Sequence, residues 1–259
     1  MKTTDRRPII LVSNDDGIDA KGVRALIEAL PDHCEIICVC PDGPRSAQGM
    51  ALTLSTPMRV KRIEDFAGAR MYKVNGTPVD CVKIGVDVII KGLPDLVVAG
   101  INHGSNAAVN VIYSGTMGAV MEGCAFGVTS VGFSLTTHDP DADFTGCGPF
   151  VKEIVNKLIE KPLPEDVCLN VNIPAGKPFP TEMRIARGCR GKWIDNYAEF
   201  TDPQGETFYW LTGKFINGEP DATDTDEWCL NHRIVSVVPT LLDRTAPDLK
   251  HYDYLVTKD

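Results

Sequence analysis

Residues 9–17 read IILVSNDDG, and this stretch decides the fold of the chain. Its first four residues are apolar and mostly β-branched, which predicts a short strand buried on both faces of a sheet. Apolar residues then recur at helical spacing as far as Pro31, at Val23, Leu26, Ile27 and Leu30. The stretch therefore predicts a strand, a polar loop at its carboxyl end and a helix.

The same order of strand and helix recurs along the chain. Buried strands are predicted at residues 35–41, 96–99 and 129–133. A helix is predicted between the last two of these strands, because apolar residues recur there at helical spacing and would form one face, at Met117, Val120, Met121 and Cys124. Thr77 followed by Pro78 is typical of another helix start. Strands that alternate with helices predict an α/β fold, in which a parallel sheet over about residues 8–174 is covered on both faces.

The composition changes after residue 174, where prolines, alternating polar residues and aromatic residues predict hairpins and long loops. We expect a single domain over residues 1–259, with a core of about residues 8–174 and a β-hairpin-rich extension of about residues 175–259. The extension carries an aromatic cluster of Phe208, Tyr209, Trp210 and Phe215. The sequence leaves open whether this cluster packs onto the sheet or forms an oligomer contact.

The composition excludes several classes of protein. The chain of 259 residues has a formal net charge of -9, which argues against a surface that binds the phosphates of a nucleic acid stably. Its first apolar run is too short for a signal peptide, and no run is long enough to span a membrane, so we expect a cytoplasmic protein. None of the nine cysteines has the C-x-x-C spacing of zinc or redox sites, which favours buried thiols.

Asp15 and Asp16 are adjacent carboxylates in the loop that follows the first strand. Two such groups repel each other and lose hydration, and a bound cation would offset that cost. The alternative is a solvated turn with a helix N-cap, because Asp, Asn and Gly are common in such turns. The loop lacks the D-x-D-x-T pattern of phosphatases that form an aspartyl phosphate.

Two further polar loops open at the same edge of the predicted sheet. One of them comprises residues 100–106 and 113–116, which are rich in Gly, Asn and Ser. It precedes a helix, whose N-terminus offers free N–H groups to a phosphate. The loop at residues 42–49 contains Arg45, a candidate for a phosphate oxygen, and Ser46, a candidate metal ligand. A Walker A motif and the G-x-G-x-x-G fingerprint are both absent, which disfavours an NAD-dependent oxidoreductase. Three polar loops on one sheet edge favour a joint functional site.

At these loops the chain resembles the SurE survival-protein family of nucleoside monophosphate phosphatases. The resemblance is carried by IILVSNDDGIDAKGVRAL, PDGPRSAQG, VNGTPVDCV, GINHGSNAAVNVIYSGTMGAVMEG and NVNIP, and it covers residues 8–174 densely. Val79 stands where many relatives have alanine, and we expect it to face the core. The resemblance implies a Rossmann-like fold, a homodimer or homotetramer, and substrates that include nucleoside 5'- and 3'-monophosphates.

The resemblance also implies the roles of individual residues. One divalent metal ion is expected on Asp15, Asp16, Ser46 and Asn102. The substrate phosphate is expected among Asn106, Ser114, Gly115 and Thr116. Oxygen ligands without sulfur or clustered histidine favour Mg²⁺ or Mn²⁺ over zinc.

These expectations combine into a metal-dependent 5'-nucleotidase that releases phosphate, with 3'-nucleotides and short polyphosphates as further candidate substrates. The cation would activate a water for in-line attack on phosphorus, and Asp15 or Asp16 would orient that water as a catalytic residue. A covalent route through Asp15 or Ser46 stays open. His103 is a weaker candidate for the general acid, because a lone loop histidine is more often solvated. The alternative function is a nucleotide sensor that binds metal and nucleotide without catalysis.

Overall fold

The computed structural model describes residues 6–256, so that residues 1–5 and 257–259 of the predicted domain lie outside the described part. A nine-stranded sheet forms its centre, in the order β3-β4-β2-β1-β5-β6-β7-β11-β8. The strands along the chain up to the extension are β1 (Ile9–Ser13), β2 (Glu35–Pro41), β3 (Val60–Arg62), β4 (Arg70–Val74), β5 (Leu96–His103), β6 (Ser130–Leu135) and β7 (Val167–Ile173). β4, β2, β1, β5, β6 and β7 run parallel to one another, whereas β3 runs antiparallel to β4. The predicted α/β fold is confirmed.

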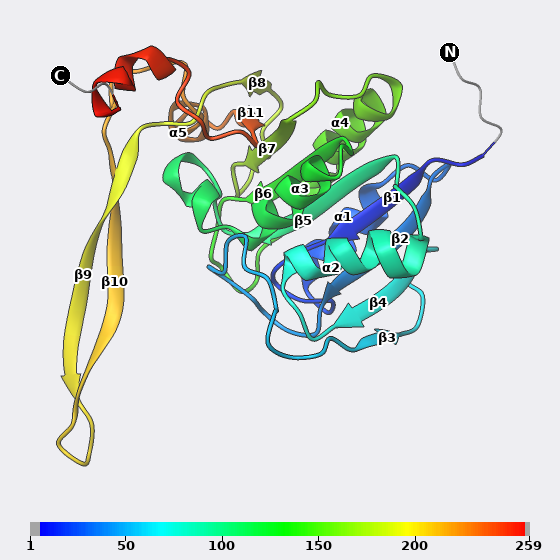
Figure 1. Cartoon of the computed structure of the whole chain (residues 1–259), viewed down its shortest axis with the longest axis horizontal. Coiled ribbons are helices and arrows are strands. Elements are labelled where there is room, and N and C mark those ends of the chain that lie inside the picture. Colours follow the sequence, from blue (N-terminus) through cyan, green and yellow to red (C-terminus); the bar gives the residue numbers. More distant parts are fainter. Residues whose placement is uncertain (1–5, 257–259) are drawn as a thin grey trace.

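Helices cover both faces of this sheet (Figure 1). The main helices are α1 (Lys21–Ala29), α2 (Pro78–Ile84), α3 (Gly115–Ala125) and α4 (Gly148–Glu160). The other helical segments are η1 (Gly85–Ile90), η2 (Ala108–Ile112), η3 (Thr145–Cys147), α5 (Asp226–Asn231) and η4 (Leu249–Leu255). The predicted start of α2 is confirmed, because Thr77 caps the helix and accepts a hydrogen bond from the Asp80 N–H.

The alternation of side chains along β1 distributes the core between the two faces. Ile10 and Val12 pack with α1 and α4, whereas Leu11 packs with α2 and α3. All three side chains are fully buried, and so is Val79, as expected. A strand that is apolar on both faces is thus explained by a helix layer on each side.

The sheet continues beyond residue 174 into the extension. β11 (Val235–Leu241) pairs antiparallel with β7, and β8 (Met183–Ile185) pairs parallel with β11. The residues between them form a long hairpin of β9 (Gly191–Thr201) and β10 (Thr207–Asn217), which projects from the body in Figure 1. Trp210 near its tip is 66% exposed. Of the two alternatives for the aromatic cluster, packing onto the sheet does not occur at Phe208, Tyr209 and Trp210, all of which are exposed.

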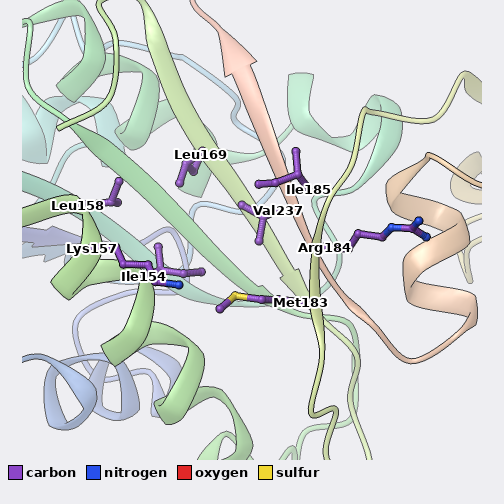
Figure 2. Close-up of a pocket in the computed structure, with 8 residues that line it drawn as sticks. All are labelled: Ile154, Lys157, Leu158, Leu169, Met183, Arg184, Ile185 and Val237. Carbon is purple, nitrogen blue, oxygen red and sulfur yellow. The ribbon is translucent and has the colours of Figure 1, made fainter. Parts of the chain in front are cut away.

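A mostly apolar cavity of about 330 Å³ lies between α4 and the strands β7, β11 and β8. Figure 2 shows Met183 and Val237 inside the cluster that lines it, whereas Arg184 points away toward α5. It shares no lining residue with the cavity at the polar loops described below. Over residues 6–256, no helix combines the length and apolar character that a membrane span requires.

Candidate active site

The loop that carries Asp15 and Asp16 begins where β1 ends, and main-chain contacts hold it in place. Asn14 donates from Nδ2 to the Gly17 carbonyl at 2.8 Å, which closes the turn. The N–H of Arg45 donates to the Asp15 carbonyl at 2.7 Å. The N–H of His103 donates to Oδ2 of Asp16 at 3.0 Å. The loops after β1 and β2 and the end of β5 are therefore joined at one sheet edge, as predicted.

Asp15 lies against the N-terminus of α3. Oγ1 of Thr116 donates a hydrogen bond to Oδ1 of Asp15 at 2.5 Å. A Cβ atom on Gly115 would lie 2.7 Å from the Asp15 Cβ, so a side chain at this position would displace the carboxylate. Ser114 caps the helix by accepting a hydrogen bond from the Met117 N–H at 3.0 Å. The first turn of α3 thus fixes the position of Asp15.

Burial raises the pKa of both carboxyl groups. The pKa of Asp15 rises to about 6, mainly because burial penalises the charged form, and the charge of Asp16 adds to the rise. The hydrogen bond from Thr116 opposes this shift. Burial also raises the pKa of Asp16, against the effect of the His103 N–H. Within residues 6–256, no lysine or arginine is a cause of either shift, and the basic group that acts on the pair is His103, whose charge lowers the pKa of Asp16.

A bulge in β5 brings Asn102 to the same edge. The pairing of β5 with β6 shifts register between Ala99 and Asn102. Gly100 in the bulge has φ of +120°, and a Cβ there would lie 2.3 Å from the Phe133 carbonyl oxygen, which explains the need for glycine. The Asn102 amide donates to the Gly104 carbonyl and to Oδ1 of Asn106. Its two N–H groups are thereby used, which leaves its Oδ1 oxygen for a ligand.

Asn106 is held by a buried polar network that spans three strands. Its main-chain N–H donates to Oδ1 of Asn172 at 2.8 Å, and its Nδ2 donates to Oγ of Ser134 at 2.8 Å. Asn170 donates from Nδ2 to the Asn106 carbonyl at 2.8 Å. A buried polar network of this kind fixes a loop because each group would cost free energy if left unpaired. The Gly-rich loop is therefore rigid at Asn106.

The carboxyl ends of the strands border a cavity of about 610 Å³. Six of the eight predicted site residues line it, namely Asp15, Asp16, Ser46, Asn102, Asn106 and Ser114. Gly115 and Thr116 do not line it, and Thr116 is fully buried behind Asp15. The Arg45 guanidinium binds Asp42 at 2.8 Å and lies outside the lining.

His103 also lines the cavity, and its Nε2 atom is buried without a hydrogen-bond partner among the described residues. Its ring lies beside those of His138 and Phe144, with centroid distances of 6.4 Å and 6.0 Å. This packing orients the ring.

The oxygen atoms at this edge fit a hard divalent cation. Asp15 supplies a buried carboxylate and Asp16 a partly buried one, neither of them neutralised by a lysine or arginine of the described residues, and Asn102 presents a free carbonyl oxygen. Among residues 6–256 no cluster of three or more His, Cys, Asp or Glu side chains is placed to hold a metal, so neutral oxygen atoms must complete any ligand set.

Several residues of the site were not predicted as functional from the sequence. Ser134 and Asn172 position Asn106, and their signal is the presence of polar residues inside otherwise apolar strands. Trp193, Phe215 and Glu227 line the cavity from the extension. No local pattern links these three residues to the loops of the sheet.

Comparison with known proteins assigns the chain to a family. The sequence model described as "Survival protein SurE" matches residues 10–195. The chain is 45% identical to the 5'-nucleotidase SurE of Phocaeicola vulgatus, with 93% of each chain covered, and 46% identical to that of Bacteroides fragilis, with 93% of this chain and 94% of the relative covered. The crystal structure of the Sure protein from Aquifex aeolicus superposes with a TM-score of 0.83 at 35% identity and covers 96% of this chain and 99% of that one. The chain therefore belongs to the SurE family.

Proposed function

We propose that this chain is a metal-dependent 5'-nucleotidase, which hydrolyses nucleoside monophosphates to a nucleoside and phosphate. The observation that carries the proposal is the adjacent pair of carboxylates, Asp15 buried and Asp16 partly buried, which no lysine or arginine among residues 6–256 neutralises, at the edge of a cavity large enough for a nucleotide. The relatives named 5'-nucleotidase SurE support the reaction class. We extend the proposal to 3'-nucleotides and short polyphosphates as further substrates.

We propose that Asp15, Asp16, Ser46 and Asn102 hold one divalent cation, Mg²⁺ or Mn²⁺. When bound, such a cation stabilises the negative charge that develops on the phosphoryl group during the reaction. The carboxylates contribute charge, whereas Ser46 and Asn102 contribute neutral oxygen atoms. The free Oδ1 atom of Asn102 and the exposed position of Ser46 in the cavity support this assignment.

The two carboxylates differ in their surroundings, and this suggests a division of roles. The side chain and the main chain of Thr116 both bind the Asp15 carboxylate and immobilise it, which suits a ligand. Asp16 is only partly buried and receives its hydrogen bond at Oδ2, from the main-chain N–H of His103. Its other oxygen is then free to accept a proton from the attacking water, so we propose Asp16 as the residue that orients this water.

We assign the phosphate to the surroundings of Asn106, Ser114, Gly115 and Thr116. Direct contacts are proposed for Asn106 and Ser114, because both line the cavity. The Ser114 hydroxyl accepts a hydrogen bond as a helix cap and keeps its own hydrogen to donate. Gly115 and Thr116 would act through the position of Asp15.

We also propose that the chain forms one domain and assembles as a homodimer or homotetramer in the cytoplasm. The exposed aromatic residues of the β9–β10 hairpin support an assembly through this element. All nine cysteines are free thiols, which fits a reducing compartment.

The test measures phosphate release from adenosine 5'-monophosphate with Mn²⁺ and with excess EDTA. We expect EDTA to abolish turnover, and Asp15→Asn and Asp16→Asn each to lower kcat by orders of magnitude, since each removes a charge that a divalent ion requires. Asp65→Asn is the matched control, because this exposed carboxylate pairs with Arg62 away from the cavity. Full turnover in EDTA would refute the metal, and near-wild-type turnover in both variants would refute the site.

The same experiment separates the enzyme from the alternative nucleotide sensor. A sensor would show Mn²⁺-dependent nucleotide binding by calorimetry, and its nucleotide would remain intact. Two added carboxylates would gain little for such binding alone, because they repel the phosphate. The carboxylate pair therefore favours the enzyme.

A further inference from the structure

The cavity at the carboxylates extends to the root of the β9–β10 hairpin. Its lining includes Trp193 from β9 and Phe215 from β10, in addition to the metal and phosphate residues. Asn110 and Tyr113, which follow the Gly-rich loop, form part of the same wall. One continuous space therefore joins the proposed site of the reaction to a group of aromatic side chains.

Trp193 is held in one orientation. Its Nε1–H donates to Oδ1 of Asn110 at 2.8 Å. The Phe215 ring contacts the indole edge to face, at a centroid distance of 6.1 Å and an angle of 63°. Despite these contacts Trp193 remains 38% exposed. A large apolar ring that is fixed in position and open to a polar cavity is a preformed surface for a planar ligand.

A second cavity of about 440 Å³ continues beyond Trp193 along the hairpin. Ala47, Asn110, Tyr113 and Trp193 line both cavities. Tyr113 is half exposed at this shared wall. The space therefore has a polar, charged end at Asp15 and a largely aromatic end at Trp193 and Tyr113. This polarity matches a molecule with a phosphate at one end and an aromatic heterocycle at the other.

We propose that Trp193 is the platform on which the nucleobase of the substrate stacks, with Tyr113 at the border of the same subsite. The inference rests on the proposed nucleotidase function and specifies how the substrate lies. The phosphate end faces Ser114, and the sugar spans the cavity. Glu227 lines the cavity on the side of the extension, where its carboxylate accepts hydrogen bonds from hydroxyl groups and repels the phosphate.

Stacking on an indole adds affinity for any base because every base has a π-face, and it is stronger for the larger purine ring. The subsite should therefore affect KM more than kcat, since the base is remote from the reacting phosphorus. It should also prefer purine over pyrimidine nucleotides. Substrates without a base gain nothing from Trp193.

The experiment compares adenosine 5'-monophosphate with ribose 5-phosphate, which has the same phosphate and sugar but no base. For Trp193→Ala we expect KM for the nucleotide to rise about tenfold, with kcat unchanged, and KM for ribose 5-phosphate to stay within about twofold. Trp193→Phe keeps a ring for stacking and should retain most of the affinity. Phe200→Ala removes another β9 aromatic, which stacks on Phe208 outside both cavities, and should match the wild type.

Equal rises of KM for both substrates in Trp193→Ala, or no rise for either, would overturn the base platform. If Trp193→Ala does not fold, the wild-type protein decides: kcat/KM should be about tenfold higher for adenosine 5'-monophosphate than for ribose 5-phosphate, and equal values would overturn the inference. Hydrolysis of neither compound by the wild type with Mn²⁺ would instead contradict the proposed function. The two failures are therefore distinguishable.

Discussion

Thr116 donates a hydrogen bond from Oγ1 to Oδ1 of Asp15 at 2.5 Å across 101 positions of sequence. Both side chains are buried, Thr116 completely and Asp15 to 4% exposure. The bond joins the loop after β1 to the first turn of α3, and it is the only side-chain hydrogen bond to the Asp15 carboxylate among the described residues. Thr116 is thus a positioning residue, which holds a proposed metal ligand in one orientation.

Thr116→Val removes this hydroxyl and nearly preserves the volume of the side chain. We expect a fall of about tenfold to a hundredfold in metal affinity, because residues that orient ligands usually contribute this much. The hydrogen bond lowers the pKa of Asp15, so its loss raises that pKa, and the acidic limb of the pH–rate profile should move to higher pH. Kinetics at several pH values and Mn²⁺ titration measure both effects.

Thr116→Ser is the matched control because it retains the hydroxyl. It should restore the pH profile even if the lost methyl group lowers stability. An unshifted acidic limb in Thr116→Val would contradict the positioning role, and a similar shift in both variants would reduce Thr116 to a packing residue.

The raised pKa of Asp15 predicts how the stability of the metal-free protein varies with pH. The folded-state pKa of about 6 lies above the ordinary value of 3.8 for an aspartate, so the folded state holds the proton more tightly than the unfolded state. The contribution of Asp15 to stability is therefore fully present below about pH 4 and is lost as the pH rises through about 6. At about 1.4 kcal/mol per pKa unit, the loss is about 3 kcal/mol.

Asp15→Asn removes this dependence, because the amide keeps an oxygen that accepts from Thr116 and carries no charge. In EDTA, we expect the variant to be more stable than the wild type at pH 7.5 and close to it at pH 4. Urea unfolding at both pH values measures the difference. If the free energy of unfolding varied with pH in the same way in both proteins, Asp15 would ionise in the folded state without loss of stability, which would contradict this prediction.

Much of the fold was predictable because the strands carry their own signal. β1 and β2 are apolar on both faces, and only a sheet between two helix layers buries both faces. Three loops at one sheet edge followed from this arrangement. The resemblance to the SurE family is confirmed.

The rest depends on contacts that no local pattern encodes. The bond between Thr116 and Asp15 joins residues that only the fold brings together, and it gives Thr116 a contact with Asp15 that the sequence did not predict. Trp193 reaches the cavity because a hairpin far along the chain folds back beside Asn110. The sheet also continues with β11 and β8. β8 is a short, mostly exposed edge strand, and it was not predicted because it lacks the continuous apolar run of a central strand.

Ser114→Ala tests the phosphate end of the cavity. The substitution removes the hydroxyl that lines the cavity, so we expect KM for phosphate monoesters and the inhibition constant of inorganic phosphate to rise several-fold. It also removes the α3 cap, which costs about 1 kcal/mol of stability. Ser114→Thr keeps both functions and should restore the kinetics. Unchanged phosphate inhibition in Ser114→Ala would place the phosphate elsewhere.

Shortening the hairpin tests whether it makes the assembly. Deletion of the whole segment between β7 and β11 would also remove β8, which pairs with β11, and Asp226, whose carboxylate binds the N–H groups of Ala108 and Cys189. A sharper change removes residues 198–210 and joins Tyr197 to Leu211, which face each other in the register, through an Asn-Gly turn.

This deletion takes away the exposed aromatic residues of the tip, including Trp210, and leaves Trp193 and its contact with Asn110 in place. Because exposed apolar area of this kind usually marks an interface, we expect a smaller assembly by light scattering with an unchanged thermal unfolding midpoint of the body. Turnover of ribose 5-phosphate should persist, since the sheet-edge loops are intact. An assembly of unaltered size would show that the interface lies elsewhere on the subunit, whereas loss of the folded body would show that the hairpin stabilises the sheet itself.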